Sequence, residues 1–186
     1  MTAVARSRLI EIVKVRSFST GSETKLVSGR STNFYFNMKP SMLHPEGAHL
    51  MATLILDALQ GARVDFVGGL EMGAVPLATA VSVTSYARGQ PLPAFFVRKQ
   101  AKEHGARKLV EGLAPGETLR DKRVVILEDV TTTGGSSMKA IEAVKAEGAV
   151  IERVISVVDR LEGAAETFKA AGIPFQALLT AADFRD

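Results

Sequence analysis

The stretch that decides the fold is RVVILEDVTTTGGSSMKA, Arg123–Ala140. Its first residues are apolar and predict a buried strand over 123–128, and a helix is expected over 136–147. Two acids, Glu128 and Asp129, end the strand, and a loop rich in hydroxyls and glycine follows. The sequence therefore predicts that two adjacent carboxylates pass from the core directly into a loop suited to binding an anion.

The loop itself has the features of a phosphate site. Gly134 and Gly135 permit positive φ and close backbone approach, so several N–H groups can point into one concavity. The next helix adds the positive end of its dipole. Hydroxyls that could donate to the same anion belong to Thr131, Thr132, Thr133 and Ser136. A plain helix cap is the alternative for the hydroxyls alone.

The two acids indicate what else the ligand carries. Glu128 and Asp129 would repel a phosphate, but carboxylates accept hydrogen bonds from a pair of vicinal hydroxyls. A ligand with a phosphate at one end and a diol close by is a ribose 5-phosphate. The residues alone therefore suggest a phosphoribosyl site, and the loop lacks the Gly-Lys-Ser/Thr ending of a Walker A motif.

Composition narrows the class of protein. A chain of 186 residues, 46% of them hydrophobic, suits one domain with a sizeable core. A net charge of +3 is compatible with an anionic small molecule and does not indicate nucleic acid. The absence of cysteine excludes disulfides and thiolate chemistry. With no signal peptide at the N-terminus and no bilayer-spanning segment, we expect a soluble cytoplasmic protein with no membrane partner.

Helix and strand signals alternate along the chain. We expect helices over 2–16, 45–61, 72–89, 136–147 and 163–171, strands over 64–69, 92–99, 123–128, 150–158 and 174–180, two short strands within 24–40, and a long loop over 99–122 with one hairpin at 108–111. This order predicts an α/β fold with a mostly parallel sheet covered on both faces. Ligands bind beyond the carboxyl ends of such strands, which selects the loops 68–73, 129–135 and 159–163.

The segment VVILEDVTTTGGS resembles the phosphoribosyl-diphosphate motif of type I phosphoribosyltransferases. The resemblance implies that family's fold, with a mostly parallel central sheet flanked by helices and a small N-terminal hood. It implies a single domain over 1–186, with the hood over roughly 1–40, the core over roughly 45–180 and a mobile catalytic loop over roughly 98–110.

A second segment, RKQAKEHG, is dense in cations. A solvated surface loop is the usual fate of such a run. It nevertheless resembles the flexible catalytic loop of the orotate phosphoribosyltransferases, which implies contacts from Arg98, Lys99, Lys102 and His104 to the diphosphate. Lys102 is the cation expected to matter most for rate.

Three further segments resemble the same family. SGRSTNFYFNMKP resembles the hood, which implies that two neighbouring aromatic residues border the orotate ring, either Phe34 and Tyr35 or Tyr35 and Phe36, with Lys25 nearby on the preceding strand. DRLEG resembles the segment that places Arg160 on the pyrimidine. GGLEMGAVPLA resembles the diphosphate loop, with Glu71 and Met72 at the contact positions.

The resemblance implies that the chain transfers a phosphoribosyl group from 5-phosphoribosyl 1-diphosphate to orotate, giving orotidine 5′-phosphate and diphosphate in pyrimidine (UMP) biosynthesis. Glu128 and Asp129 would hold the ribose hydroxyls, Val130 to Ser136 the 5′-phosphate, and Thr132 would also reach the base. Mg²⁺ would be held mainly by substrate oxygens and water, with no direct protein ligand. The family also implies a homodimer whose active sites draw Lys102 and His104 from the other subunit.

Two alternatives stay open. A purine phosphoribosyltransferase would share the Glu128–Asp129 loop, but it would not need Arg160 or the basic loop. A regulator that keeps the fold and binds nucleic acid without catalysis should show an added DNA-binding domain or a strongly basic face. The net charge of +3 and the complete basic loop favour the enzyme.

Overall fold

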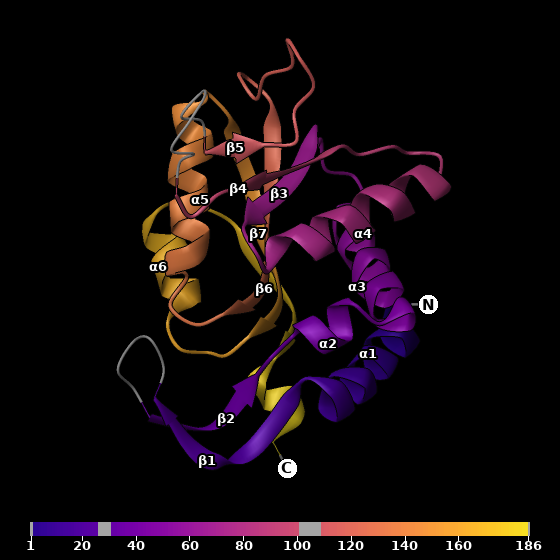
Figure 1. Ribbon diagram of the computed structural model, residues 1–186, viewed down its shortest axis with the longest axis vertical. Coiled ribbons are helices and arrows are strands. Elements are labelled where there is room, and N and C mark those ends of the chain that lie inside the picture. The colour runs from indigo at the N-terminus through magenta and orange to yellow at the C-terminus, as the bar shows by residue number, and fades with distance from the viewer. Residues whose placement is uncertain (1, 26–30, 101–108, 186) are drawn as a thin grey trace.

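The computed structural model describes residues 2–25, 31–100 and 109–185 (Figure 1). Lys102 and His104 of the predicted catalytic loop lie outside the described residues. The elements in chain order are α1 (Thr2–Arg16), β1 (Phe18–Lys25), β2 (Ser31–Phe36), α2 (Lys39–Met42), α3 (Pro45–Ala58), β3 (Phe66–Leu70), α4 (Ala74–Ala87), β4 (Ala94–Val97), β5 (Val110–Glu111), β6 (Arg123–Thr131), α5 (Gly135–Ala146), β7 (Val150–Asp159), α6 (Ala164–Ala170), β8 (Phe175–Thr180) and the 3-10 helix η1 (Ala181–Phe184).

Six strands form the central sheet in the order β5-β4-β3-β6-β7-β8. Every pair is parallel except β4 with β5, so the predicted mostly parallel sheet is confirmed. Because β3, β6 and β7 are neighbours and parallel, their carboxyl ends meet at one edge. The loops that follow these three strands therefore lie side by side.

Alternate residues of β6 face two separate hydrophobic cores. Val125 and Leu127 pack in the core formed with α1, α3 and α4, while Val124 and Ile126 pack in the core formed with α5 and α6. Figure 1 shows α5 and α6 beside one face of the sheet and α3 and α4 beside the other. An apolar strand covered on both faces is what a run without polar alternation predicts.

The expected end of the central strand is wrong by three residues. β6 continues to Thr131 because β7 runs alongside it, pairing Val130 with Val158 and Thr131 with Asp159. Glu128 and Asp129 therefore lie within the strand, and the loop begins only after Thr131. Two short helices, α2 and η1, were not expected, and β1 begins at Phe18, earlier than the expected hood strands.

Within the predicted hood, β1 and β2 form an antiparallel pair. Phe18 and Phe36 face one another across the pair, with ring centres 5.1 Å apart, and both rings contact Phe184 of η1 at 5.5 and 5.0 Å. This aromatic cluster attaches the hood to the segment after β8. No helix in the described parts of the chain is both long and apolar enough to span a bilayer.

Candidate active site

The three predicted loops meet at the carboxyl edge of the sheet. They follow β3, β6 and β7, and the last two are joined directly, since the backbone N–H of Arg160 donates to the carbonyl of Thr131 over 2.9 Å. The acids, the hydroxyl loop and Arg160 are thus brought to one side of the molecule, as parallel pairing requires.

Glu128 is a buried carboxyl at this edge. Burial, together with the neighbouring charge of Asp129, raises its pKa to about 8. Ser137 of α5 opposes the shift by donating its hydroxyl hydrogen to Glu128 Oε2 over 2.9 Å. The surroundings of Glu128 therefore favour the neutral form of its carboxyl.

Asp129 lies against the loop between β3 and α4. A Cβ added to Gly73 would stand 2.4 Å from Asp129 Oδ1, so a larger residue there would displace this carboxylate. In the same loop Glu71 Oε1 accepts a hydrogen bond from the backbone of Lys99 over 2.8 Å. The peptide bond between Glu71 and Met72 is cis, and the Met72 side chain is 59% exposed. The predicted diphosphate loop therefore adjoins both the acid pair and the start of the basic segment.

The hydroxyl loop ends at Gly134, the N-cap of α5, which has φ of 87°. That left-handed conformation suits glycine, and it turns the chain into the twelve-residue helix α5. Thr131 is buried, and its hydroxyl has no hydrogen-bond partner among the described residues. Thr133 and Ser136 are exposed, and Thr132 is half-buried. The loop thus presents hydroxyls and a helix N-terminus together.

Arg160 is buried, and its contacts differ from those of a surface ion pair. Its Nε and Nη2 both lie 2.9 Å from Glu162 Oε1, and its Cζ lies 4.6 Å from the centre of the Phe34 ring. Tyr35, the next residue of β2, is 46% exposed. The structure therefore brings Phe34 of β2 into contact with Arg160 at the sheet edge.

Lys25 of the predicted hood and Arg98 of the basic loop lie at the ends of two strands. Lys25 ends β1, opposite Ser31. Arg98 follows β4, and its backbone N–H donates to the carbonyl of Leu109 over 2.9 Å. Its guanidinium lies 3.9 Å from Glu111, which places one cation of the basic loop at the end of β4.

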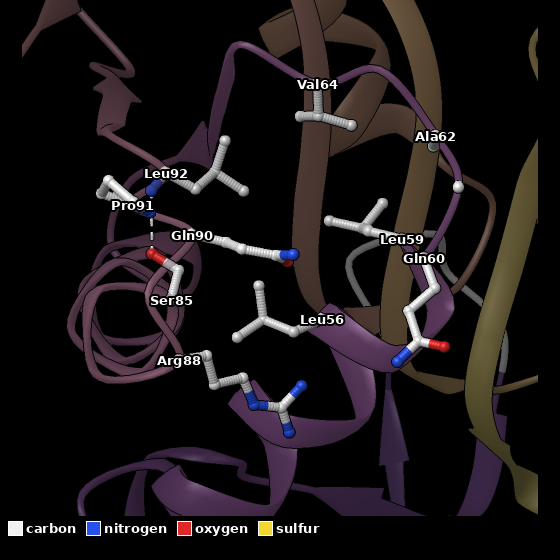
Figure 2. A pocket seen from close by; sticks show the side chains of 11 residues that line it. Leu56, Leu59, Gln60, Ala62, Val64, Ser85, Arg88, Gln90, Pro91 and Leu92 are labelled. Carbon is white, nitrogen blue, oxygen red and sulfur yellow. Dashed lines mark hydrogen bonds between the residues drawn. The ribbon is translucent and has the colours of Figure 1, made fainter.

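A cavity of about 620 Å³ lies at the opposite edge of the sheet, between the ends of α3 and α4 (Figure 2). Leu56 comes from α3 and Leu59 directly follows that helix, Ser85 comes from α4 and Arg88 directly follows that helix, and Leu92 lies on the approach to β4. Arg88 pairs with Asp57 over 2.8 Å. None of the predicted site residues lines this cavity.

Comparison with known proteins indicates the same family that the sequence motifs resemble. A family model for the phosphoribosyl transferase domain matches residues 41–171. The orotate phosphoribosyltransferase of Bradyrhizobium diazoefficiens is 57% identical over 182 residues, covering 98% of this chain and 97% of its own. That of Sorangium cellulosum is 47% identical over 98% of this chain and 94% of its own.

Solved structures indicate the same family. The orotate phosphoribosyltransferase of Mycobacterium tuberculosis, in complex with Fe(III) dicitrate, superposes with a TM-score of 0.83 at 37% identity, over 97% of this chain and 98% of its own. The chain belongs to the orotate phosphoribosyltransferases. A second structure of the M. tuberculosis enzyme, bound to 5-phospho-α-D-ribosyl 1-diphosphate, superposes with a TM-score of 0.78 at 32% identity, over 98% of this chain and 92% of its own.

The predictions of a pentosyltransferase and of its fold are therefore confirmed, and the purine enzyme and the regulator are set aside. Two residues of this orotate phosphoribosyltransferase that shape the acid pair, Ser137 and Gly73, are not evident from its sequence. Ser137 is nine positions after Glu128 and carries no local signal. Gly73 stands directly before a helix, where a glycine invites the explanation of a turn and not of a neighbouring carboxylate.

Proposed function

We propose that the carboxyl edge of β3, β6 and β7 is where the phosphoribosyl group passes from 5-phosphoribosyl 1-diphosphate to orotate. The observation that carries the proposal is that three different loops converge there. One brings an acid pair and hydroxyls with a helix N-terminus, one brings Gly73 against Asp129, and one brings Arg160 beside Phe34.

The phosphoribosyl end of the substrate fits the loop after β6. Asp129 and Glu128 accept hydrogen bonds from the ribose 2′- and 3′-hydroxyls and so orient the ring. The 5′-phosphate binds to the segment from Val130 to Ser136, where backbone N–H groups and the α5 terminus favour negative charge. The unpartnered hydroxyl of the buried Thr131 supports this assignment.

The base binds between the hood and the loop after β7. Arg160 offers a planar fork to the orotate ring, with Phe34, Tyr35 and Lys25 on the hood side and Thr132 on the phosphate side. A guanidinium suits an anionic pyrimidine because orotate carries a carboxylate.

The reaction needs charge stabilisation more than covalent help. As the bond between C1′ and the diphosphate oxygen breaks, positive charge grows on the ribose and negative charge on the leaving group. The acid pair faces the ribose, and the cations of the basic loop face the diphosphate. These cations are Arg98, Lys99, Lys102 and His104. Glu71 and Met72 contribute the backbone of the diphosphate loop, and Lys102 is the proposed catalytic cation.

Magnesium is part of the proposal. The described ranges hold no group of three or more acidic or histidine side chains that could bind a metal ion together. We expect Mg²⁺ to be held mainly by substrate oxygens and water, as is usual for this ion, with the acid pair close by. When bound, Mg²⁺ supplies further neutralisation of the diphosphate.

A homodimer with shared active sites and a cytoplasmic location complete the proposal. Both come from the resemblance and the composition of the chain. In such a dimer, Lys102 and His104 of one subunit would serve the site of the other.

The test is a turnover assay. Purified protein is mixed with 5-phosphoribosyl 1-diphosphate and Mg²⁺, and loss of orotate absorbance is followed after orotate is added. Adenine, hypoxanthine and uracil are run in parallel by diphosphate release. Turnover with orotate alone is expected. Turnover with a purine or uracil instead would keep the phosphate site and discard the roles given to Arg160 and the hood.

A further inference from the structure

Arg185 follows η1 and contacts the ring that borders the proposed base site. Its Cζ lies 4.5 Å from the centre of the Phe34 ring, and the Cζ of Arg160 lies 4.6 Å from the same centre. The two guanidinium carbons are therefore no further apart than the sum of these distances. One aromatic ring of the hood thus links a residue from the loop after β7 to a residue from the segment after β8.

The position of Arg185 is fixed by the residues just before it. Phe184 is buried in the aromatic cluster with Phe18 and Phe36. Asp183 closes a capping box with Thr180, and its Oδ2 also accepts a hydrogen bond from Arg6 over 2.7 Å. The burial of Phe184 and the ion pair of Asp183 with Arg6 hold η1 against the core. Arg185 is therefore held beside Phe34 by a rigid support.

The charge at this site explains why a second cation matters. Arg160 is buried with both its Nε and its Nη2 directed at Glu162, so much of its positive charge is balanced locally. An anionic base gains less from a balanced pair than from a net positive charge. Arg185 is exposed and adds a full positive charge on the other contact of the same ring.

We propose that Arg185 is a positioning residue for the anionic base: it holds Phe34 of the hood against the sheet edge and makes the base site net positive. The inference rests on the proposed function. In this role Arg185 does not contact the reacting atoms and takes part in no chemical step.

The test compares Arg185→Gln, Arg185→Lys and wild-type protein in steady-state kinetics and in direct calorimetric binding of orotidine 5′-phosphate. The matched control is Arg88→Gln, since Arg88 lies at the opposite edge beside the cavity of Figure 2. For Arg185→Gln, the KM for orotate should rise about two- to fivefold, the factor an exposed cation–π contact contributes. kcat and the KM for 5-phosphoribosyl 1-diphosphate should stay within twofold of wild type, as should every parameter of Arg88→Gln.

Two further readouts separate positioning from simple structural support. Arg185→Lys should recover part of the orotate KM, because it keeps the charge. Arg185→Gln combined with Phe34→Leu should raise the orotate KM by less than the product of the single effects, because Arg185 acts through that ring. An unchanged orotate KM in Arg185→Gln, or equal changes in all kinetic parameters with a lowered Tm, would overturn the proposal. Failure of the wild-type protein to bind orotidine 5′-phosphate or to use orotate would overturn the function itself, and this inference with it.

Discussion

Ser137 donates a hydrogen bond to Glu128 across 2.9 Å, and both side chains are buried where β6 meets α5. A helix hydroxyl thus supports a carboxyl that its surroundings hold in the neutral form. The contact favours the ionised state, whereas burial and Asp129 favour the protonated one. The pKa of Glu128 therefore reflects a balance between these opposing contacts.

Glu128→Gln should change how stability depends on pH. The carboxyl titrates near 4.5 when unfolded and near 8 when folded, so between these values the folded state binds more protons. Stability contributed by this group is therefore present below about pH 4.5 and is lost as pH rises towards 8. Glutamine stays neutral, so at pH 9 the free energy of unfolding of the variant should exceed that of wild type by a few kcal/mol, at about 1.4 kcal/mol per pKa unit.

Urea unfolding of ligand-free protein at pH 4.5 and pH 9 measures this difference. Glu142→Gln, at an exposed position of α5, is the control and should show no such dependence. A gain in the free energy of unfolding for Glu128→Gln that is the same at both pH values would contradict the raised pKa of Glu128.

Gly73→Ala should damage the use of 5-phosphoribosyl 1-diphosphate. The backbone of Gly73 has φ of −58°, which alanine adopts freely, so the effect comes from the new Cβ, 2.4 Å from Asp129 Oδ1. Displacing this carboxylate should lower kcat/KM for the diphosphate substrate by about 100-fold, the cost of a misplacement near 1 Å. Orotidine 5′-phosphate binding should fall as well, since that ligand also presents the ribose diol.

Asp129→Asn provides the comparison. It should lower the same kcat/KM, and combining it with Gly73→Ala should add little, because both changes act on one carboxylate. Effects that multiply in the double variant would mean that Gly73 serves the site by another route.

Lys102→Ala should reduce kcat by about 100- to 1000-fold while the Tm stays within a degree or two of wild type, as expected for one lost group that stabilises transition-state charge. Lys145→Ala, at an exposed position near the end of α5, removes the same side chain elsewhere and should keep wild-type kcat. Near wild-type turnover in Lys102→Ala would remove the basic loop from the mechanism.

Mixing two variants of low activity tests the shared sites. If the loop of one subunit serves the other, a dimer of Lys102→Ala with Asp129→Asn contains one intact site and one doubly altered site. After random exchange of subunits, about a quarter of wild-type turnover should return, because half of the dimers are mixed. Turnover that stays at the level of the separate variants would show that each chain completes its own site.

Local patterns predicted most of the sheet. The apolar runs around Val67, Ile126 and Ile155 have the length and composition of strands covered on both faces, and all three lie in the sheet. The sequence predicts the end of β6 three residues too early, because acids usually end a strand. Its continuation depends on β7, whose alignment is a property of the folded sheet.

The same distinction applies to the candidate site. Loops beyond parallel strands could be located, because alternation of strands and helices determines which ends meet. The contacts of Glu128 with Ser137, Asp129 with Gly73, and Phe34 with Arg185 each join separate elements. They depend on packing between those elements, for which a single sequence holds no local signal.

Gly68 and Gly69 of β3 affect how large-scale mutagenesis of this chain should be interpreted. A Cβ on Gly68 would stand 2.3 Å from the carbonyl oxygen of Phe95, and one on Gly69 would stand 2.2 Å from that of Leu127. Every replacement at either position would force neighbouring strands apart. In a mutational scan scored by growth without added pyrimidine, variants at both glycines would be as depleted as variants of the acid pair. A parallel scan of protein abundance would separate the two groups, because the glycine variants fail to fold whereas the acid-pair variants lose catalysis.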